Sequence, residues 1–269
     1  MVEQNARELL ELAQRVARRA AETARRTRTE AIGQVDTKST ATDVVTAADR
    51  AVERQIVEEL RAVRPGDGFL GEEYGVQEDS AASGVRWVID PIDGTVNYLY
   101  GLPQYAVSIA AEADGEVIAG VVVNAASGEE WHATLGGGAW RGDRRLSGST
   151  QTVLAQALVG TGFAYSAERR AVQGAVVAGL ITRVRDIRRF GSAALDLCAA
   201  AEGMLDAYYE RGLNPWDLAA GGLIAREAGL LVTGLSGKPA GADLALAAPP
   251  ALHKQLHDQL VELDADSGP

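Results

Sequence analysis

The middle of the N-terminal half of the chain reads Trp87-Val88-Ile89-Asp90-Pro91-Ile92-Asp93-Gly94-Thr95. The apolar run at its start predicts a buried strand, and two carboxylates follow at the end of that strand. Pro91 fixes one backbone angle and Gly94 frees another, so we expect a sharp turn here. That turn would aim Asp90, Asp93 and the Ile92 carbonyl at one small volume. Carboxylates so close together repel unless a cation lies between them, and all-oxygen ligands suit a hard cation such as Mg²⁺.

The end of the same stretch predicts an anion site. Gly94 and Thr95 offer backbone N–H groups and a hydroxyl, as an anion needs at the start of a helix. The stretch therefore predicts a place where a metal and a phosphate meet. Asp, Pro and Gly are also ordinary turn residues, so an acidic surface turn is the alternative that these residues alone leave open.

The composition favours a large globular unit. The chain has 269 residues, 46% of them apolar, which is ample for a buried core. Its single cysteine, Cys198, excludes an intramolecular disulfide and suits a reducing cytoplasm, where we expect the protein. No apolar run approaches the roughly 18 residues of a membrane span. Glu3, Glu8 and Glu11 interrupt any secretion signal, so we expect no membrane association.

The formal net charge of −11 argues against a nucleic-acid partner, because such partners usually need a basic face. The same charge should repel a phosphorylated substrate at long range. Screening limits this repulsion to about 8 Å at physiological salt, so the local charge decides. Bound cations would reverse the local sign.

The periodicity of the first half predicts two helices followed by strands. One amphipathic helix runs to about Arg28. Thr46 and Asp49 resemble a capping box that opens a second helix, which ends before Pro65. The expected strands, of which the last three form an antiparallel meander, cover residues 69–73, 86–90, 107–111, 117–123 and 129–135.

Beyond Leu146 strands and helices alternate. The expected strands cover residues 157–161, 186–190, 207–210 and 244–248, and the expected helices cover residues 167–182, 192–202, 215–228 and 249–262. Such alternation predicts an α/β half, residues 147–269, after a more antiparallel α+β half, residues 1–146. Because no flexible linker separates the halves, we expect residues 1–269 to form one compact unit.

Three further acids stand where they could join the same site. Glu72 ends a predicted strand, Asp217 is the third residue of a predicted helix, and Asp49 lies near the start of another. Each also has a routine interpretation, because Glu72 fits a solvated strand end and Asp49 a helix cap. Asp217 fits an acid that the helix dipole stabilises. Spacing along the chain leaves both interpretations open.

Several motifs resemble the signatures of the inositol monophosphatase family, in the family's order and over nearly the whole chain. They are Lys38 with Asp43-Val44-Val45-Thr46-Ala47-Ala48-Asp49, Gly71-Glu72-Glu73, the stretch at residues 87–95, Arg189-Phe190-Gly191-Ser192-Ala193-Ala194, Asp206-Ala207-Tyr208-Tyr209-Glu210 and Pro215-Trp216-Asp217-Leu218-Ala219-Ala220-Gly221. The central motif is highly specific, and the chain looks like an actinobacterial-type member. The resemblance implies a lithium-sensitive, Mg²⁺-dependent phosphatase, usually homodimeric. It also implies the layered α-β-α-β-α sandwich shared with fructose-1,6-bisphosphatase.

The resemblance also implies ligands for two to three Mg²⁺ ions in each site. Glu72, Asp90 and the Ile92 carbonyl would hold the first ion. Asp90, Asp93 and Asp217 would hold the second. A third, weaker ion would bind near Glu72, largely through water.

Catalytic and substrate roles follow from the same resemblance. Thr95, linked to Asp49, would orient the attacking water, and Glu72 would help to deprotonate it. The N–H groups of Gly94 and Thr95 would take phosphate oxygens, while the Ser192-Ala193 helix start and Glu210 would contact substrate hydroxyls. The implied substrate-binding residues are Asp93, Gly94, Thr95, Ser192, Ala193, Glu210 and Asp217.

The expected reaction is hydrolysis of myo-inositol 1-phosphate, or of a related polyol or sugar monophosphate, by a metal-activated water. Asn214-Pro215 stands where the family often has His or another residue, which puts leaving-group preference in question. Histidinol phosphate, fructose 1,6-bisphosphate and a nucleotide phosphate are the alternative substrates within the fold. A regulatory protein that binds transcription machinery is the alternative of another class, against which the complete set of acids weighs.

Overall fold

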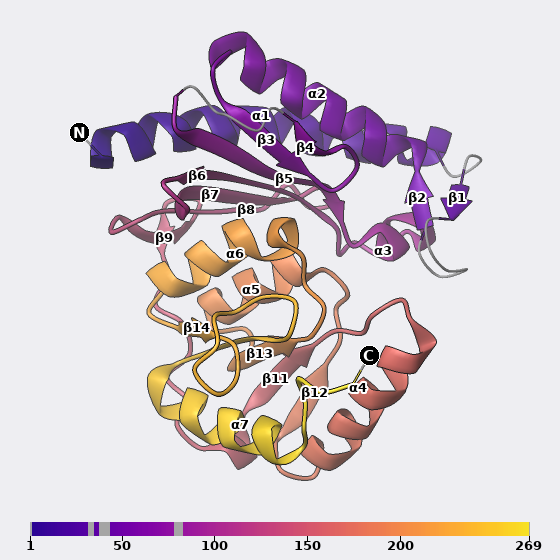
Figure 1. Ribbon diagram of the computed structural model, residues 1–269, viewed down its shortest axis with the longest axis vertical. Coiled ribbons are helices and arrows are strands. Elements are labelled where there is room, and N and C mark those ends of the chain that lie inside the picture. Colours follow the sequence, from indigo (N-terminus) through magenta and orange to yellow (C-terminus); the bar gives the residue numbers. More distant parts are fainter. Residues whose placement is uncertain (1, 32–34, 38–43, 78–82, 269) are drawn as a thin grey trace.

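A computed structural model describes residues 2–31, 35–37, 44–77 and 83–268 of the chain. Within these residues, Figure 1 shows two long helices, a large sheet, two central helices, a smaller sheet and an outer pair of helices, stacked along the longest axis. This order of layers confirms the α-β-α-β-α fold.

Eight strands form the larger sheet in the described part of the chain. They are β3 (Gly68–Gly71), β4 (Gly75–Gln77), β5 (Val85–Asp93), β6 (Ala106–Ala113), β7 (Glu116–Asn124), β8 (Glu130–Thr134), β9 (Gly138–Arg141) and β10 (Arg144–Arg145). Their order across the sheet is β10-β9-β8-β7-β6-β5-β3-β4. Neighbouring strands are antiparallel except β3 and β5, which run parallel. The C-terminal ends of β3 and β5 therefore lie side by side at the same end of the sheet.

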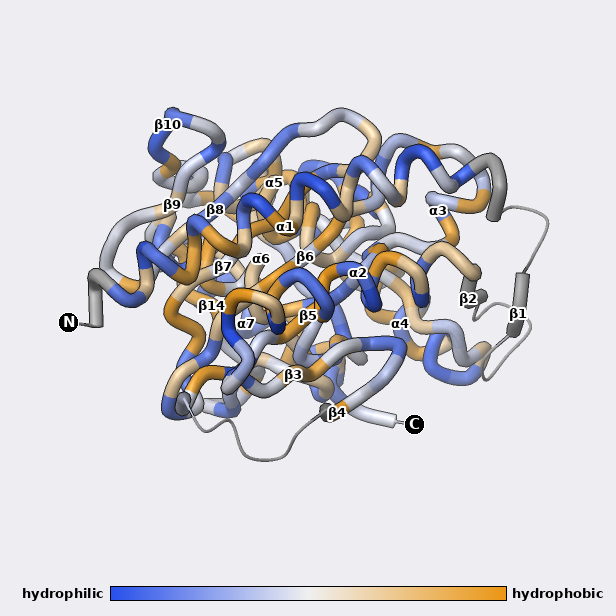
Figure 2. Tube along the Cα trace, turned by 90° about the horizontal axis from the view of Figure 1, so that it is seen from above, coloured by the Kyte–Doolittle hydropathy of each residue, from blue (hydrophilic) through white to orange (hydrophobic). Residues whose placement is uncertain are grey.

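Two long helices, α1 (Val2–Ala31) and α2 (Ala47–Val63), cover the outer face of this sheet. Hydrophilic and hydrophobic segments alternate along α1 in Figure 2, as an amphipathic helix requires. Leu9 and Val16 of α1 are at most 1% exposed. They share one core with Ile56 of α2 and Trp87 of β5, so the predicted amphipathic stripe is a packing surface.

The middle layer consists of α5 (Ala193–Glu202) and α6 (Pro215–Glu227), which lie between the two sheets. Close packing here depends on Gly120 of β7, because an added Cβ would lie 3.0 Å from the Cα of Ala220 in α6. Both α5 and α6 begin near the end of the larger sheet where β3 and β5 finish.

Five described strands form the smaller sheet. They are β11 (Leu158–Thr161), β12 (Asp186–Arg188), β13 (Ala207–Glu210), β14 (Leu231–Thr233) and β15 (Ala245–Ala248), in the order β12-β11-β13-β15-β14. The first three in that order are parallel, and the other pairs are antiparallel. Its outer face packs on α4 (Ala167–Leu180) and α7 (Pro250–Glu262), with Leu180 and Leu256 fully buried.

The structure confirms the expected helices and long strands, with shifts of a few residues at their ends. It differs at β5, which extends to Asp93 instead of ending at Asp90, so the sharp turn comes only at Gly94 (φ 91°). Some short elements were not expected, because two to six residues carry too little periodicity to detect: α3 (Thr95–Tyr100), β1 (Val35–Thr37), β2 (Val44–Thr46), β4, β9, β10, β14 and a 3₁₀ turn at Leu154–Gln156.

Among the described helices, none combines the length and the apolarity that crossing a bilayer requires. Lys38 and Asp43 lie outside the described residues, as does the side chain of Thr46. The division at residue 146 stays a prediction.

Candidate active site

Two of the expected carboxylates come from the end of β5. Residues three apart in a regular strand point to opposite faces of a sheet. The pairing of β5 with β6 becomes irregular between Asp90 and Asp93, where Pro91 has no N–H for the ladder. This irregularity lets both carboxylates face one side. The chain then turns at Gly94, where an added Cβ would lie 2.8 Å from the Gln104 carbonyl oxygen, so only glycine fits.

A third carboxylate, Asp217, lies in the first turn of α6. Asn214 is the N-cap and Pro215 the first helical residue, as the sequence predicted. The Asn214 N–H donates to Asp217 Oδ2 at 2.6 Å. Asp217 therefore caps its helix and faces the other acids at the same time, so the routine interpretation and the functional one do not exclude each other.

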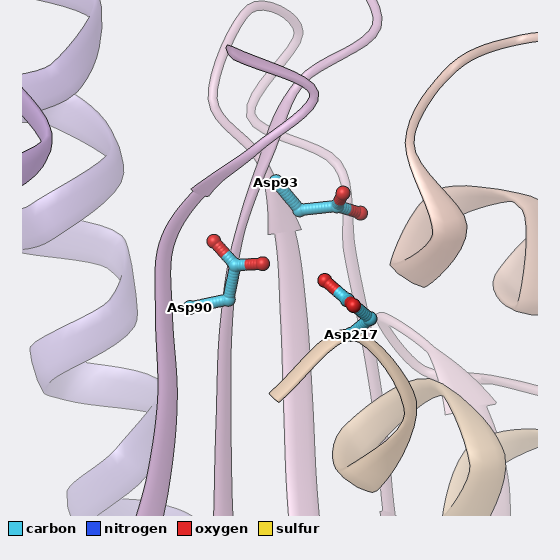
Figure 3. A group of neighbouring side chains, drawn as sticks. All are labelled: Asp90, Asp93 and Asp217. Atoms are coloured by element: carbon cyan, nitrogen blue, oxygen red, sulfur yellow. The ribbon is translucent and has the colours of Figure 1, made fainter. Parts of the chain in front are cut away.

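Figure 3 shows Asp90, Asp93 and Asp217 pointing into one space from β5 and α6. One carboxylate oxygen of each residue lies within 4.8 Å of the others. Asp90 is 1% exposed, and its Oδ1 has no hydrogen-bond partner among the described residues. Burial raises the pKa of Asp90 well above its ordinary value, and the charges of Glu72, Asp93 and Asp217 raise it further. A cation between these oxygens would relieve both effects, so the donor set fits Mg²⁺.

Glu72 and Asp49 approach this cluster from the outer layers. Glu72 follows β3, donates its N–H to the Ile89 carbonyl at 3.2 Å, and lines the same cleft as the three aspartates. Asp49, in the first turn of α2, is 1% exposed and is not among the described residues that line the cleft. Its charge contributes to the raised pKa of Asp90, so it lies within electrostatic range of the cluster.

The expected phosphate residues lie beside the aspartates. Gly94 and Thr95 line the cleft, and Gly94 is the N-cap of α3. The Thr95 hydroxyl donates to the Ile92 carbonyl at 3.1 Å. This bond joins two groups that the sequence assigned separately, one to the metal and one to the water. The predicted link between Thr95 and Asp49 stays a prediction.

The start of α5 is bonded to Asp93. The Ser192 hydroxyl donates to Asp93 Oδ2 at 2.6 Å, and the Ala194 N–H donates to the same oxygen at 2.7 Å. Burial raises the pKa of Asp93, although these two hydrogen bonds oppose the rise. Ser192 is 1% exposed and Ala193 lines the cleft. Of the predicted pair, Ser192 therefore holds a residue of the acidic cluster while Ala193 borders the cleft, and their contact with substrate stays a prediction.

Glu210 lines the cleft at the end of β13. The Tyr208 hydroxyl donates to it at 2.6 Å. Gly162 leaves room for the carboxylate, since an added Cβ there would lie 1.9 Å from Glu210 Oε2. Burial raises the pKa of Glu210 to about 7, against the opposing effect of the Tyr208 bond.

All the predicted site residues except Asp49 and Ser192 line one cleft of about 330 Å³. Three arginines for which the sequence predicted no role, Arg169, Arg189 and Arg211, line the cleft too. Arg189 begins the motif Arg189-Phe190-Gly191-Ser192-Ala193-Ala194, which is a signal in the sequence for this residue. No signal identified Arg169 of α4 or Arg211 after β13, because only the fold brings those elements to the cleft. Together they place positive charge beside an acidic cluster.

The chain is similar to known proteins over most of its length. A family model described as the inositol monophosphatase family matches residues 5–265. The inositol-1-monophosphatase of Mycobacterium leprae is 49% identical over 229 residues, which cover 82% of this chain and 79% of that protein.

Proteins called SuhB are similar as well. The crystal structure of extragenic suppressor protein suhB from Bartonella henselae has a TM-score of 0.88 at 35% identity, and the match covers 94% of this chain and 98% of that one. Nus factor SuhB of Pasteurella multocida is 43% identical over 205 residues, or 76% of each protein.

Proposed function

Because the chain belongs to the inositol monophosphatase family, and is therefore a phosphatase, we propose that it hydrolyses myo-inositol 1-phosphate or a closely related polyol monophosphate with Mg²⁺. One observation carries the proposal. Asp90, Asp93 and Asp217 converge on a single space within a cleft that also holds Glu210 and the start of α3. An acid cluster suited to a cation thus stands beside groups suited to a phosphate and to hydroxyls.

The residues that would hold two to three Mg²⁺ ions are Glu72, Asp90, the Ile92 carbonyl, Asp93 and Asp217. When bound, Mg²⁺ supplies positive charge for the phosphate and for the leaving oxygen, and it lowers the pKa of water. The unpartnered buried oxygen of Asp90 and the raised pKa of this carboxyl support the assignment.

The remaining steps fall to groups of the chain. The Thr95 hydroxyl, which donates to the Ile92 carbonyl, still has lone pairs with which to accept from the attacking water. Glu72 lines the same cleft and would take a proton from that water as its oxygen attacks phosphorus. The N–H groups of Gly94 and Thr95 would bind phosphate oxygens while the bond to the leaving oxygen breaks, and that oxygen would take its proton from solvent water.

Glu210 and Ala193 would border the polyol. A carboxylate that accepts from Tyr208 still has acceptor positions for substrate hydroxyls. The arginines favour a second candidate substrate, a phosphate ester with another anionic group, such as fructose 1,6-bisphosphate or a nucleotide phosphate.

The test is phosphate release from a panel of esters with and without Mg²⁺. We expect the highest kcat/KM for inositol 1-phosphate and a smaller value for fructose 1,6-bisphosphate. A higher value for the bisphosphate would select the second candidate. Absence of Mg²⁺-dependent release from every ester would refute the proposed function.

We also propose that the enzyme is a cytoplasmic homodimer that lithium inhibits. Sedimentation would show the expected dimer mass. The name Nus factor, given to the Pasteurella multocida relative, motivates a second assay, in which wild-type chain and an inactive variant are mixed with transcription complexes. Equal binding by both proteins would support a regulatory role in addition to catalysis.

A further inference from the structure

Glu53 of α2 is a fully buried carboxylate that the proposed mechanism does not use. It is 0% exposed. Its Oε2 accepts from the N–H of Glu73 at 2.8 Å, and its Oε1 accepts from the N–H of Tyr74 at 3.2 Å. Both donors lie in the turn between β3 and β4, directly after Glu72. One side chain of a helix therefore fixes two consecutive peptide groups of the turn that presents Glu72.

Gly71, the residue before Glu72, leaves the space that the Glu53 carboxylate fills. An added Cβ on Gly71 would lie 2.0 Å from Glu53 Oε1 and 2.4 Å from its Cδ. Gly71 does not have a positive φ, so the glycine is explained by space and not by backbone conformation. The residues on both sides of Glu72 are thus matched to Glu53.

Two more residues of α2 hold the same turn. Arg50 Nε lies 3.7 Å from the Glu73 carboxylate, which is almost fully buried. Arg54 donates to the Tyr74 hydroxyl at 3.3 Å. Glu72 is directed elsewhere, because it lines the cleft and its own N–H is bonded to β5. Residues 73 and 74 are therefore anchored to the helix while Glu72 is directed at the acidic cluster.

We propose that Glu53 is a positioning residue, which sets the orientation of Glu72 and thereby the affinity of the cluster for Mg²⁺. The inference rests on the proposed function, since it takes Glu72 as a metal ligand. A ligand held in place before the cation arrives loses less conformational freedom on binding. Mutation of a residue that orients a metal ligand commonly lowers metal affinity by about 10–100-fold.

The test compares Glu53→Gln with the wild type in Mg²⁺ titration by calorimetry, at a temperature well below unfolding. Gln keeps the shape but turns an amide N–H towards a backbone donor. We expect Mg²⁺ to bind about 10-fold more weakly, and amide hydrogens at residues 72–74 to exchange faster in the metal-free protein. Glu58→Gln makes the same change at an exposed position of α2 and should alter neither.

Gly71→Ala is the second variant, because it leaves the carboxylate in place but displaces it. If both variants act on one contact, the double variant should lose little more Mg²⁺ affinity than either alone. Unchanged Mg²⁺ affinity in folded Glu53→Gln, or in Gly71→Ala if Glu53→Gln does not fold, would overturn the inference. A wild type that neither binds Mg²⁺ nor cleaves any ester would instead overturn the proposed function. Exchange at residues 72–74 would still decide whether Glu53 holds the turn.

Discussion

The acidic and the basic residues that line the cleft are brought together in different ways. Glu72, Asp90, Asp93 and Asp217 stand at the ends of regular elements, inside short contiguous motifs. The three arginines come from separate segments: Arg169 lies in α4, Arg189 precedes α5, and Arg211 follows β13. Five acids and three arginines line the cleft, so a chain of net charge −11 would need bound cations as well as these arginines to take an anionic substrate. Under the proposed function the acids would carry the chemistry and the arginines would favour certain substrates, and each set can be perturbed alone.

Removal of the cation should have the largest effect, because it disables the acidic cluster completely. We expect excess chelator to abolish phosphate release and Mg²⁺ to restore it. Calcium should inhibit, since its larger size and higher coordination number suit this geometry poorly. Lithium should lower activity where equal sodium spares it. Full activity in chelator would contradict the metal mechanism, whereas lithium resistance alone would not.

Asp90→Asn should come next in size. Asn keeps the shape of the side chain but removes the charge at the most buried position of the cluster. The loss of several kcal/mol of transition-state stabilisation corresponds to a decrease in kcat on the order of 1,000-fold. The metal-free variant should melt no lower than the wild type, because mutual repulsion is relieved. Substantial Mg²⁺-dependent turnover in the folded variant would remove Asp90 from the site.

Glu210→Gln tests the choice of substrate separately from the metal chemistry, because Glu210 lines the cleft outside the acidic cluster. The change weakens a charge-assisted hydrogen bond to the polyol, for which about 1.5–3 kcal/mol is typical. We therefore expect kcat/KM to fall by roughly 10–100-fold for inositol 1-phosphate and little for p-nitrophenyl phosphate, which has no polyol. Equal loss on both esters would place Glu210 in the metal or structural framework.

The smallest expected effect is the change in stability of the metal-free protein with pH. Burial raises the pKa of Glu53 and of Glu210 from 4.5 to about 7. Between these values the folded state binds more protons than the unfolded state, so stability is greatest below the window and falls as the pH rises through it. Melting curves from pH 4.5 to 7.5 should show this fall, at roughly 2–4 °C per kcal/mol. Glu210→Gln should flatten the slope, and an unchanged slope would show that Glu210 does not titrate there.

How far the sequence predicts the site depends on which contacts are local. The stretch at residues 87–95 and the start of α6 predict their elements and acids, because strand, turn and cap signals lie within a few residues of each other. The irregular pairing of β5, which brings Asp90 and Asp93 to one side, depends on β6 and leaves no local trace.

The contacts of Glu53 could not be predicted from the sequence either. It follows Asp49 by one helical turn, and both are buried, whereas acids of an amphipathic helix usually face water. Its partners are peptide groups of the β3–β4 turn, which no side-chain pattern reveals. The Ser192 hydroxyl likewise bonds to Asp93 across 99 residues of chain, although the sequence predicted only a helix start there and the family resemblance only a substrate contact.

The bonds from Ser192 and Ala194 to Asp93 have a consequence for protein engineering. Asp93 belongs to the part of the chain before residue 146, and both donors belong to the part after it. The connection at residues 147–153 contains no helix or strand, and Val153 within it is 45% exposed, as is typical of tolerated cut sites. Two fragments separated there would each carry an incomplete catalytic centre. Phosphate release would then report their reassembly, which makes this fold a candidate split reporter.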